Sequence, residues 1–495
     1  MLTALYRLIT LYENSPTAII TTIFVIDLLL SFAVIFLERK SPSATLAWLM
    51  VINLLPGLGI FLYFFLSQNI TRQKLFKRSR FEMQKAGEDL SIQMDDMPYG
   101  RYKHLNPEGE KWKDLIYLNQ KHAMAFYTQN NDVRIFTEGK EKFDQLVRDL
   151  EAAEKFINME YFIMKPDDVG LRILRTLRKK AEEGVEVRLL LDAMGSRRIR
   201  EKHLKGLKAA GGKVAFFFPA NILKIQLRPN YRNHRKLVII DEKIAYVGGL
   251  NVASEYEGRS RKFSGWRDTH LRLVGGCVED VDARFLMDWK YASGENFQGD
   301  DLDYKVLIPA GRSGVQIVSC GPDSPEEEIK RVYLKMITTA KKSVFVQTPY
   351  FIPDQSIFEA LKTAALSGID VRLMIPNKPD HPFVYWVTYN NAASLMESGV
   401  KVYIYNKGFL HSKCITVDDE VSSVGSANFD IRSFKLNFEC NAVIYDKDIA
   451  RKLHNAFFKD MEQSTHLTPV IYAQRSWTIK AKEKRQTADL GYPLN

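Results

Sequence analysis

The sequence has few cysteines and lacks the short motifs that hold nucleotides or zinc. Its 495 residues include only four cysteines, and none of them forms a C-x2-C pair. Such scattered cysteines argue against a disulfide framework and a structural zinc site, and they are typical of a reducing compartment. A glycine-rich nucleotide loop and an H-E-x-x-H helix are also missing, so the sequence predicts neither a cofactor nor a catalytic metal.

Charge is almost missing from two long stretches near the N-terminus. Residues 18–37 are apolar except for Asp27, and residues 44–66 carry no charge. Each run is long enough to cross a bilayer, and the short segment 38–43 between them predicts a tight transmembrane helix hairpin. A cleaved signal peptide fits poorly, because the first run is long, follows no strongly basic region and precedes a second run at once. We expect Asp27 to face the partner helix or to lie near a membrane interface.

Positive charge exceeds negative charge, and part of it gathers after the second run. The net charge is +11 and the pI is about 9.1, which suits anionic lipid or nucleic acid equally. The basic cluster that follows the second run consists of Arg72, Lys74, Lys77, Arg78 and Arg80. The positive-inside rule therefore predicts that the N-terminus and the large C-terminal part lie in the cytoplasm. The same cluster is also suited to contact anionic headgroups.

One motif occurs twice at equal spacing. It has the form H-x-K-x4-D, followed by a glycine and an asparagine. The first copy consists of His234, Lys236, Asp241, Gly248 and Asn251. The second copy consists of His411, Lys413, Asp418, Gly425 and Asn428. Five matched positions in two copies make a chance pair of surface strands a poor explanation.

These residue types suit exchange at a phosphodiester. The apolar residues after Lys236 predict a buried strand, whose alternation puts His234 and Lys236 on one face. A neutral imidazole can attack phosphorus, and an imidazolium can protonate the leaving oxygen. Lysine and asparagine can stabilise the charge on the non-bridging oxygens. We expect the motif aspartates, Asp241 and Asp418, to orient and polarise the imidazoles.

The sequence also predicts two similar α/β units. Phe143, Leu146, Val147 and Leu150 have the spacing of an amphipathic helix, and strands and helices then alternate. Residues 350–352 echo residues 161–163, and residues 368–373 echo residues 184–189. We expect an α/β fold with a hairpin at 1–70, a basic juxtamembrane segment and linker at 71–128, and halves at 129–296 and 312–480. The halves should be related by a pseudo-twofold axis, with the active cleft where the two motifs meet.

The duplicated motif resembles that of the phospholipase D superfamily. Within it, the chain is most similar to the bacterial cardiolipin synthases that have two transmembrane segments. The stretches that carry the closer resemblance are residues 39–42, 47–49, 266–270, 321–323, 348–354 and 426–434. The resemblance covers most of the chain between about residues 38 and 445.

The resemblance implies a membrane-bound phosphatidyltransferase of the bacterial cell membrane. Two phosphatidylglycerol molecules would give cardiolipin and glycerol through a phosphatidyl-histidine. The implied nucleophile is His234, and the implied acid and base is His411. The residues implied to hold the phosphate oxygens are Lys236, Lys413, Asn251 and Asn428. A membrane-bound phospholipase D-type hydrolase or another phosphatidyltransferase would use the same residues. The predicted membrane anchor argues against a soluble nuclease. The two intact motifs argue against a non-enzymatic membrane scaffold.

Several further residues have two interpretations. Glu439, in an apolar setting after Asn428, and Asp268 are candidates to orient the opposite half's histidine or lysine, or to form a structural ion pair. We count Glu439 among the candidate substrate-binding residues. Packing or surface positions are predicted for His270 and His381, which lack the motif context. Core packing is likewise favoured over a lipid-binding stripe for Tyr385, Trp386 and Tyr389, with a position at the rim of the cleft as a further alternative.

Overall fold

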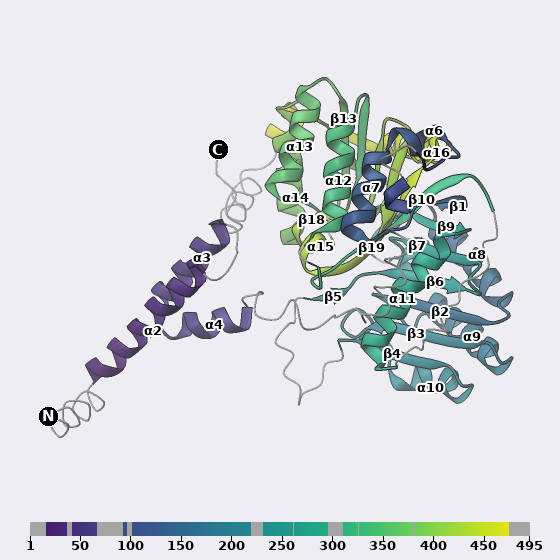
Figure 1. Ribbon diagram of the computed structural model, residues 1–495, viewed down its shortest axis with the longest axis horizontal. Coiled ribbons are helices and arrows are strands. Elements are labelled where there is room, and N and C mark those ends of the chain that lie inside the picture. The colour runs from purple at the N-terminus through teal and green to yellow at the C-terminus, as the bar shows by residue number, and fades with distance from the viewer. Residues whose placement is uncertain are drawn as a thin grey trace. The chain divides into compact units, whose positions relative to one another are not determined.

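The computed structural model describes residues 16–36, 42–66, 93–96, 101–218, 231–260, 262–295, 310–324, 326–378, 380 and 382–474. The chain divides into two compact units. The smaller unit holds helices α2 (Pro16–Phe36), α3 (Pro42–Leu54) and α4 (Leu58–Leu66). The larger unit holds the remaining described elements (Figure 1).

In the small unit, α2 packs against α3 through a face that carries polar side chains. The Asn53 amide of α3 donates a hydrogen bond of 3.1 Å to the Ser31 hydroxyl of α2. Asp27 lies one turn before Ser31 and is only 2% exposed. Asp27 therefore lies on the side of α2 that faces the neighbouring helix.

The second apolar run is not one helix, which corrects the sequence prediction. It divides into α3 and α4 around Pro56 and Gly57, and Gly57 has a φ of +75°. Proline lacks the N–H that would continue the helix, and glycine accepts the left-handed backbone that follows. Across the described ranges, no helix combines the length and hydropathy needed to cross a membrane. The transmembrane hairpin thus stays a prediction, and its loop at 37–41 lies outside the described residues.

A sheet of 16 described strands forms the centre of the large unit. Its first half contains β1 (Thr128–Phe136), β2 (Phe156–Tyr161), β3 (Glu186–Asp192), β4 (Lys213–Phe217), β6 (Lys236–Ile240), β7 (Ile244–Gly248) and β9 (His270–Val274). Its second half contains β10 (Ser313–Cys320), β11 (Ser343–Gln347), β13 (Asp370–Pro376), β14 (Lys401–Tyr405), β16 (Cys414–Val417), β17 (Val421–Gly425), β19 (Asn437–Tyr445) and the edge strand β20 (Ser464–Leu467). The short strand β5 (Arg232–Asn233) joins this sheet through β19.

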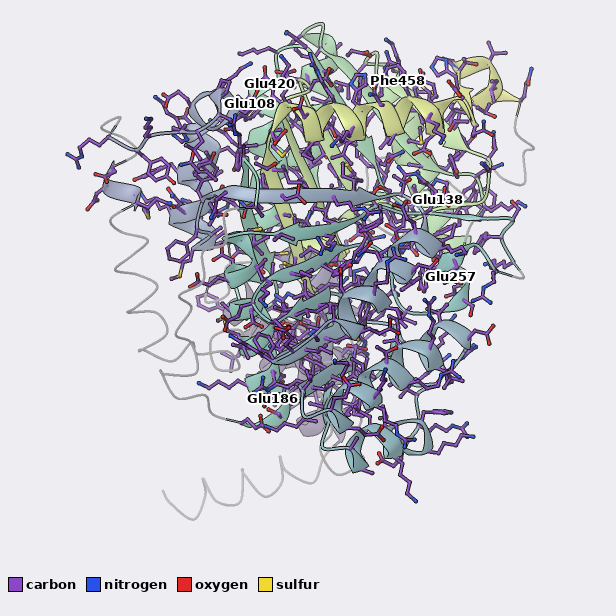
Figure 2. The ribbon with its side chains drawn as sticks, turned by 90° about the vertical axis from the view of Figure 1, so that its right-hand side faces the viewer. Glu108, Glu138, Glu186, Glu257, Glu420 and Phe458 are labelled. Atoms are coloured by element: carbon purple, nitrogen blue, oxygen red, sulfur yellow. The ribbon has the colours of Figure 1, made fainter. Side chains whose placement is uncertain are left out.

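The two halves repeat the same strand order outward from an antiparallel junction between β1 and β10. The first half runs β1-β9-β7-β6-β2-β3-β4, and the second runs β10-β19-β17-β16-β11-β13-β14. In Figure 1 the second half lies above the first, and β1 and β10 lie where the two halves meet. Glu186 and Phe458 mark opposite ends of the unit in Figure 2. The predicted pair of similar α/β halves is therefore present.

Helices cover both faces of each half. In the first half these are α8 (Gly139–Glu151), α9 (Asp168–Glu182), α10 (Glu201–Ala209) and α11 (Cys277–Ser293). In the second half they are α12 (Glu328–Thr339), α13 (Gln355–Leu366), α14 (Pro382–Met396) and α16 (Lys447–Met461), with the short α15 (Ile431–Lys435) and α17 (Pro469–Ala473). The predicted amphipathic residues of α8, from Phe143 to Leu150, are buried in the first-half core.

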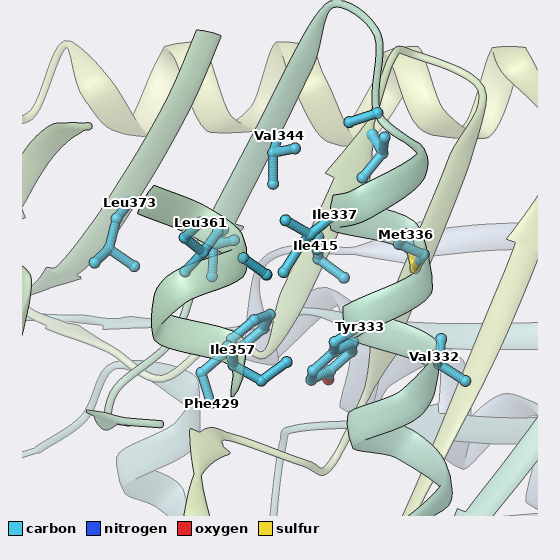
Figure 3. Packing of buried hydrophobic residues seen from close by; sticks show 14 of the residues in the cluster. Val332, Tyr333, Met336, Ile337, Val344, Ile357, Leu361, Leu373, Ile415 and Phe429 are labelled. Atoms are coloured by element: carbon cyan, nitrogen blue, oxygen red, sulfur yellow. The ribbon is translucent and has the colours of Figure 1, made fainter. Parts of the chain in front are cut away.

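Aliphatic and aromatic side chains fill the space between the helices and the second-half sheet. Figure 3 shows Tyr333 and Ile337 of α12 and Leu361 of α13 packed near Val344 and Ile415 of the strands. Tyr333 stacks on Phe429 with ring centroids 4.3 Å apart. This packing fixes the inner strands that carry the second motif.

Two details of the sequence prediction need correction. Residues 350–352 are not the counterpart of β2, because β12 (Phe351–Ile352) forms a separate parallel pair with β18 (Phe429–Asp430) and β11 takes the equivalent place in the sheet. Part of the expected linker is also integral to the fold, since α6 (Pro107–Lys111) and α7 (Lys113–Ala123) pack on the second half. The carboxylate of Glu420, which is labelled in Figure 2, belongs to the second half. It accepts hydrogen bonds from Lys111 and from Trp112.

Candidate active site

Each motif begins where an inner strand begins. His234 lies two residues before β6, and Lys236 is the first residue of that strand. His411 and Lys413 both lie just before β16, which begins at Cys414. The alternation of extended chain directs each histidine and its lysine to one face of the sheet. The prediction that the motif strands are buried is confirmed, because every residue of β6 and β16 is buried.

Each histidine is bound by a carboxylate from the other half. The Nδ1 atom of His234 lies 2.9 Å from an oxygen of Glu439, which belongs to β19 of the second half. The Nδ1 atom of His411 lies 2.7 Å from an oxygen of Asp268, which lies between β8 (Trp266–Arg267) and β9 of the first half. A carboxylate that accepts the Nδ1 proton fixes the tautomer and leaves Nε2 as a nucleophile or base. Of the two interpretations of these carboxylates, the structure favours orientation of the opposite half's histidine.

Two short parallel pairings hold these contacts in place. Strand β5 pairs with Asn437 and Phe438, and the His234 N–H donates to the Phe438 carbonyl at 2.9 Å. Strand β15 (Phe409–Leu410) pairs with β8 (Trp266–Arg267), and the His411 N–H donates to the Arg267 carbonyl at 2.7 Å. Each motif therefore rests on a strand of the opposite half, and both meet in one compact unit.

The two carboxylates have further donors that keep them ionised. Glu439 accepts hydrogen bonds from the Ser426 hydroxyl at 2.5 Å and from the Asn437 amide at 3.2 Å. Asp268 accepts from the Thr269 N–H at 2.7 Å. Burial raises the pKa of both carboxyls, but the nearby histidines, lysines and donors outweigh it and hold each pKa below its usual value.

The motif lysines are buried beside their own histidines. The ammonium of Lys236 donates to the His234 carbonyl, and that of Lys413 donates to the His411 carbonyl at 2.5 Å. Burial lowers the pKa of Lys236 to about 7 and that of Lys413 to about 8, although Glu439 and Asp268 oppose this shift. An anionic phosphate would restore the charge on both lysines.

Burial also lowers the pKa of both motif histidines to about 4. Glu439 raises the pKa of His234, while the charge of Lys236 lowers it. Lys413 lowers the pKa of His411, and Asp268 raises it. Both imidazoles are therefore neutral near pH 7 in the free protein, as a nucleophile requires.

The motif aspartates do not contact the histidines, which corrects their predicted role. Asp241 lies at the far end of β6, where its carboxylate accepts from the N–H groups of Glu154, Lys155 and Phe156 at 2.7, 2.7 and 2.9 Å. Asp418 binds three successive N–H groups before β11 in the same manner, at 2.8, 2.7 and 2.9 Å. Both aspartates have a positive φ, 54° and 56°, in the turns that connect the motif strands. They tie each hairpin turn to the start of the neighbouring strand.

The two motif asparagines differ in their contacts. Asn251 accepts from the Ile163 N–H at 3.0 Å and donates to the Tyr256 hydroxyl at 3.1 Å. Asn428 donates to Asp430 at 3.2 Å, and its Oδ1 has no hydrogen-bond partner among the described residues. Each Nδ2 carries two protons, so one of them stays available for a phosphate oxygen.

The motif glycines make room for a residue on the next strand. Gly248 pairs with His270, and Gly425 pairs with Asn441. A Cβ atom on Gly248 would lie 2.5 Å from Nδ1 of His270, and one on Gly425 would lie 2.2 Å from Oδ1 of Asn441. His270 is fully buried there, as its predicted packing role requires.

Of the three aromatic residues expected to pack in the core, Tyr389 lies against the second-half core, whereas Tyr385 and Trp386 are half-buried and belong to no core cluster of the described residues. The Tyr385 ring contacts the rings of Trp386 and Tyr389 at centroid distances of 5.2 and 5.8 Å. Tyr389 also stacks on Tyr472 at 6.0 Å. His381 lies outside the described residues.

Sequence reasoning missed Arg235, which lies between His234 and Lys236 on the opposite face. Its guanidinium donates to Asp288 at 2.5 Å and to the backbone carbonyls of Glu439 and Cys320, both at 3.2 Å. A fully buried arginine on two second-half carbonyls helps to hold β19 beside the first motif. The only sign of Arg235 in the sequence was a charged residue beside the apolar run that predicts a buried strand.

Comparisons with known proteins agree with this architecture. A family model described as "Cardiolipin synthase, PLD-like domain" matches residues 146–259 and 333–461, and one described as "Phospholipase_D-nuclease N-terminal" matches residues 19–68. A cardiolipin synthase of Staphylococcus aureus (strain Mu50 / ATCC 700699) is 48% identical over 93% of both chains. One from Oceanobacillus iheyensis is 46% identical over 93% of this chain and 96% of its own.

Among solved structures, phosphatidylserine synthase from Haemophilus influenzae Rd KW20 shares the fold. It has a TM-score of 0.60 at 15% identity, over 76% of this chain and 98% of that chain. Together with the two family models and the curated relatives, the paired motifs show that this chain belongs to the bacterial cardiolipin synthases of the phospholipase D superfamily.

Proposed function

We propose that this protein transfers a phosphatidyl group between two phosphatidylglycerol molecules and so makes cardiolipin and glycerol. The observation that carries the proposal is the reciprocal pairing of two histidines with two carboxylates, His234 with Glu439 and His411 with Asp268. One such pair activates a nucleophile, and the other supplies an acid and base. The curated names of the relatives support the same reaction.

In the first step, Nε2 of His234 attacks the phosphorus of the donor lipid. A bond forms between nitrogen and phosphorus, and the bond between phosphorus and the glycerol oxygen breaks. His411 gives its proton to that oxygen, so glycerol leaves as a neutral alcohol. Glu439 stabilises the imidazolium that carries the phosphatidyl group.

In the second step, His411 takes the proton of a terminal hydroxyl on a second phosphatidylglycerol. The freed oxygen attacks the phosphorus, the bond to His234 breaks, and cardiolipin is released. His411 regains its proton, and His234 returns to its neutral form. Two displacements in sequence give retention of configuration at phosphorus.

The phosphate group itself supplies charge that both steps need. His411 has a pKa of about 4 in the free protein, so it needs an anion nearby to become protonated near pH 7. The bound phosphodiester raises the pKa of His411 and of both lysines through Coulombic attraction. The proposed ligands of its non-bridging oxygens are Lys236, Lys413 and the free amide protons of Asn251 and Asn428.

The proposed site of action is the cytoplasmic face of the bacterial cell membrane. Support comes from the apolar runs at 18–37 and 44–66, from the basic cluster after them, and from the family-model match over residues 19–68. In this proposal the runs form a multi-pass anchor that keeps the cleft near lipid hydroxyls.

Purified protein incubated with acyl-labelled phosphatidylglycerol tests the reaction. Thin-layer separation distinguishes cardiolipin from phosphatidic acid, the product of hydrolysis. We expect cardiolipin to dominate on lipid bilayers. Phosphatidic acid as the main product would assign the protein to the hydrolases instead.

A further inference from the structure

Two residues that flank the His234–Glu439 pair, here called its rim, supply a cation and a hydrogen-bond acceptor that the reaction steps above do not use. Arg232 and Asn437 are register partners on the parallel strands β5 and β19. Each lies two residues before a catalytic group, Arg232 before His234 and Asn437 before Glu439. By strand alternation, both side chains face the same side as the catalytic pair.

Arg232 is a nearly buried cation that has no ion pair within the part of the chain that the structure describes. Only 7% of it is exposed, and its guanidinium donates to the Tyr231 carbonyl at 2.7 Å and to the Met194 sulfur at 3.1 Å. Among the described residues, no carboxylate lies within ion-pair distance of Arg232. The nearby Asp192 accepts instead from the backbone N–H groups of Gly195 and Asn233, at 2.8 and 3.1 Å. A buried charge is costly unless it is paired, so this position favours an anion.

A second arginine adds to the positive charge at the rim. Arg432 lies in α15, which leads directly into β19. Because β19 is the strand that pairs with Arg232, the end of α15 lies close to Arg232. Burial lowers the pKa of the Arg232 guanidinium, Asp192 raises it, and the Arg432 charge lowers it again. The Arg432 charge therefore acts directly on the Arg232 guanidinium.

Asn437 supplies an acceptor whose orientation is fixed. Its Nδ2 donates to Glu439 at 3.2 Å, which leaves Oδ1 buried and without a hydrogen-bond partner among the described residues. Only 5% of Asn437 is exposed. A flip of the amide would place Oδ1 against the Glu439 carboxylate, so the acceptor must remain the free atom. A hydroxyl group is the natural donor for it.

The equivalent rim beside His411 is aromatic. There the register partners are Phe409 and Trp266, which take the places of Arg232 and Asn437. Their rings pack around the His411 ring at centroid distances of 5.9 and 5.2 Å. The catalytic histidine, lysine and carboxylate are repeated in both halves, but the rim is not. The fold therefore does not require a cation and an amide at this place.

We infer that Arg232 and Asn437, assisted by Arg432, bind the phosphoglycerol headgroup of the acceptor lipid. The guanidinium groups contact the acceptor's own phosphate, which does not react, and Oδ1 of Asn437 accepts a hydrogen bond from a hydroxyl of the same headgroup. This inference rests on the proposed function, because only a phospholipid acceptor brings a second phosphate one glycerol away from the reacting one. Water and simple alcohols bring none.

A competition between two acceptors tests the subsite. Acyl-labelled phosphatidylglycerol in vesicles serves as donor and acceptor, and ethanol is added at a fixed concentration. Cardiolipin and phosphatidylethanol then arise from the same phosphatidyl-enzyme, so their ratio reports acceptor choice whatever the rate of the donor step. We expect Arg232→Gln to lower the ratio of cardiolipin to phosphatidylethanol on the order of tenfold or more, as loss of a charged hydrogen bond predicts.

Two further variants guard against misfolding and general charge effects. Arg432 is exposed, so Arg432→Gln should fold normally and still lower the ratio several-fold. Arg178→Gln on the outer surface of α9, where Arg178 binds Glu182 at 2.8 Å, is the matched control and should keep the wild-type ratio. An unchanged ratio in both rim variants would overturn the subsite alone. Wild-type protein that makes phosphatidylethanol but no cardiolipin would overturn the proposed function and the subsite with it.

Discussion

Replacing Glu439 by glutamine removes one charge from the site and keeps its shape. Glu439 is 0% exposed, and its two oxygens lie 3.0 and 2.9 Å from Nδ1 of His234. When His234 carries the phosphatidyl group, its ring becomes a cation beside this carboxylate. Opposite charges about 4 Å apart attract by about 4 kcal/mol at an effective dielectric constant of about 20. We therefore expect Glu439→Gln to lower kcat on the order of a thousandfold.

The matched variant Asp268→Asn should fail for a different reason. Asp268 raises the pKa of His411, so its removal lowers that pKa further below about 4 and leaves less acid to protonate glycerol. A donor with a nitrophenyl leaving group needs no acid, so its first-step burst should largely recover in Asp268→Asn. The loss in Glu439→Gln should persist with this donor, because the cation on His234 forms whatever group leaves.

The pH dependence separates this explanation from simple protonation. Loss of the Glu439 charge lowers the pKa of His234 below its value of about 4, so the imidazole stays neutral throughout a range of about pH 5 to 8. Raising the pH should therefore not restore Glu439→Gln. Stopped-flow detection of nitrophenol measures the burst, and circular dichroism checks folding. A loss below tenfold would refute charge stabilisation, and recovery of Glu439→Gln but not Asp268→Asn would reverse the roles of the two histidines.

Four other expectations follow from the same geometry. His234→Ala and His411→Ala should each abolish cardiolipin formation, and the double variant should be no slower; half activity in either single variant would indicate two independent sites. Asp241→Asn should lower the free energy of unfolding in urea by about 1–3 kcal/mol while the folded protein keeps its kcat, because the carboxylate binds backbone N–H groups and not an imidazole. The kcat/KM value should fall above about pH 7, since Lys236 has a pKa of about 7 and loses its charge as the pH rises; Lys236→Arg should move the start of this decline to about pH 8, where Lys413 loses its charge, and an unchanged decline from pH 7 would implicate another group. A single cysteine placed near Asn495, in a variant without the native cysteines, should resist an impermeant thiol reagent in intact cells, and ready labelling would overturn the predicted topology.

Local sequence patterns predicted the strands that carry the site. The apolar run after Lys236 and the matching motif spacing at His411 were sufficient to predict buried strands, and the period of a strand places each histidine and its lysine on one face. The repeat of these patterns indicated two similar halves, which the strand order bears out. Such features depend on neighbours within a few residues, so a single sequence contains them.

Contacts between the halves were beyond this kind of reasoning. His234 and Glu439 are 205 residues apart in the chain, and His411 and Asp268 are 143 apart. The sequence marked both carboxylates as candidates, but no local rule links residues over such separations. The cation at Arg232 was missed for the same reason, because its partner strand comes from the other half.

Two errors came from signals that were present in the sequence. Asp241 follows His234 by more than the length of β6, and at about 3.3 Å per residue it must lie roughly 20 Å away. An aspartate in a tight turn is also a common local cap for backbone N–H groups. Likewise, Pro56 and Gly57 indicated a break in the second apolar run. At Asp241 the turn conformation, and at Pro56 and Gly57 the backbone properties of proline and glycine, determined the structure. The spacing of the motif and the length of the apolar run did not.

The exchange of carboxylates between the halves bears on how such a chain arises. A symmetric dimer of one half would already contain two complete histidine–carboxylate pairs, since each copy would lend its carboxylate to the other. It would also be forced to have identical rims, because any substitution would appear on both sides at once. Duplication and fusion into one chain remove that constraint. One rim is then free to become cationic and the other aromatic, and this difference between the two ends is what the inferred acceptor subsite depends on.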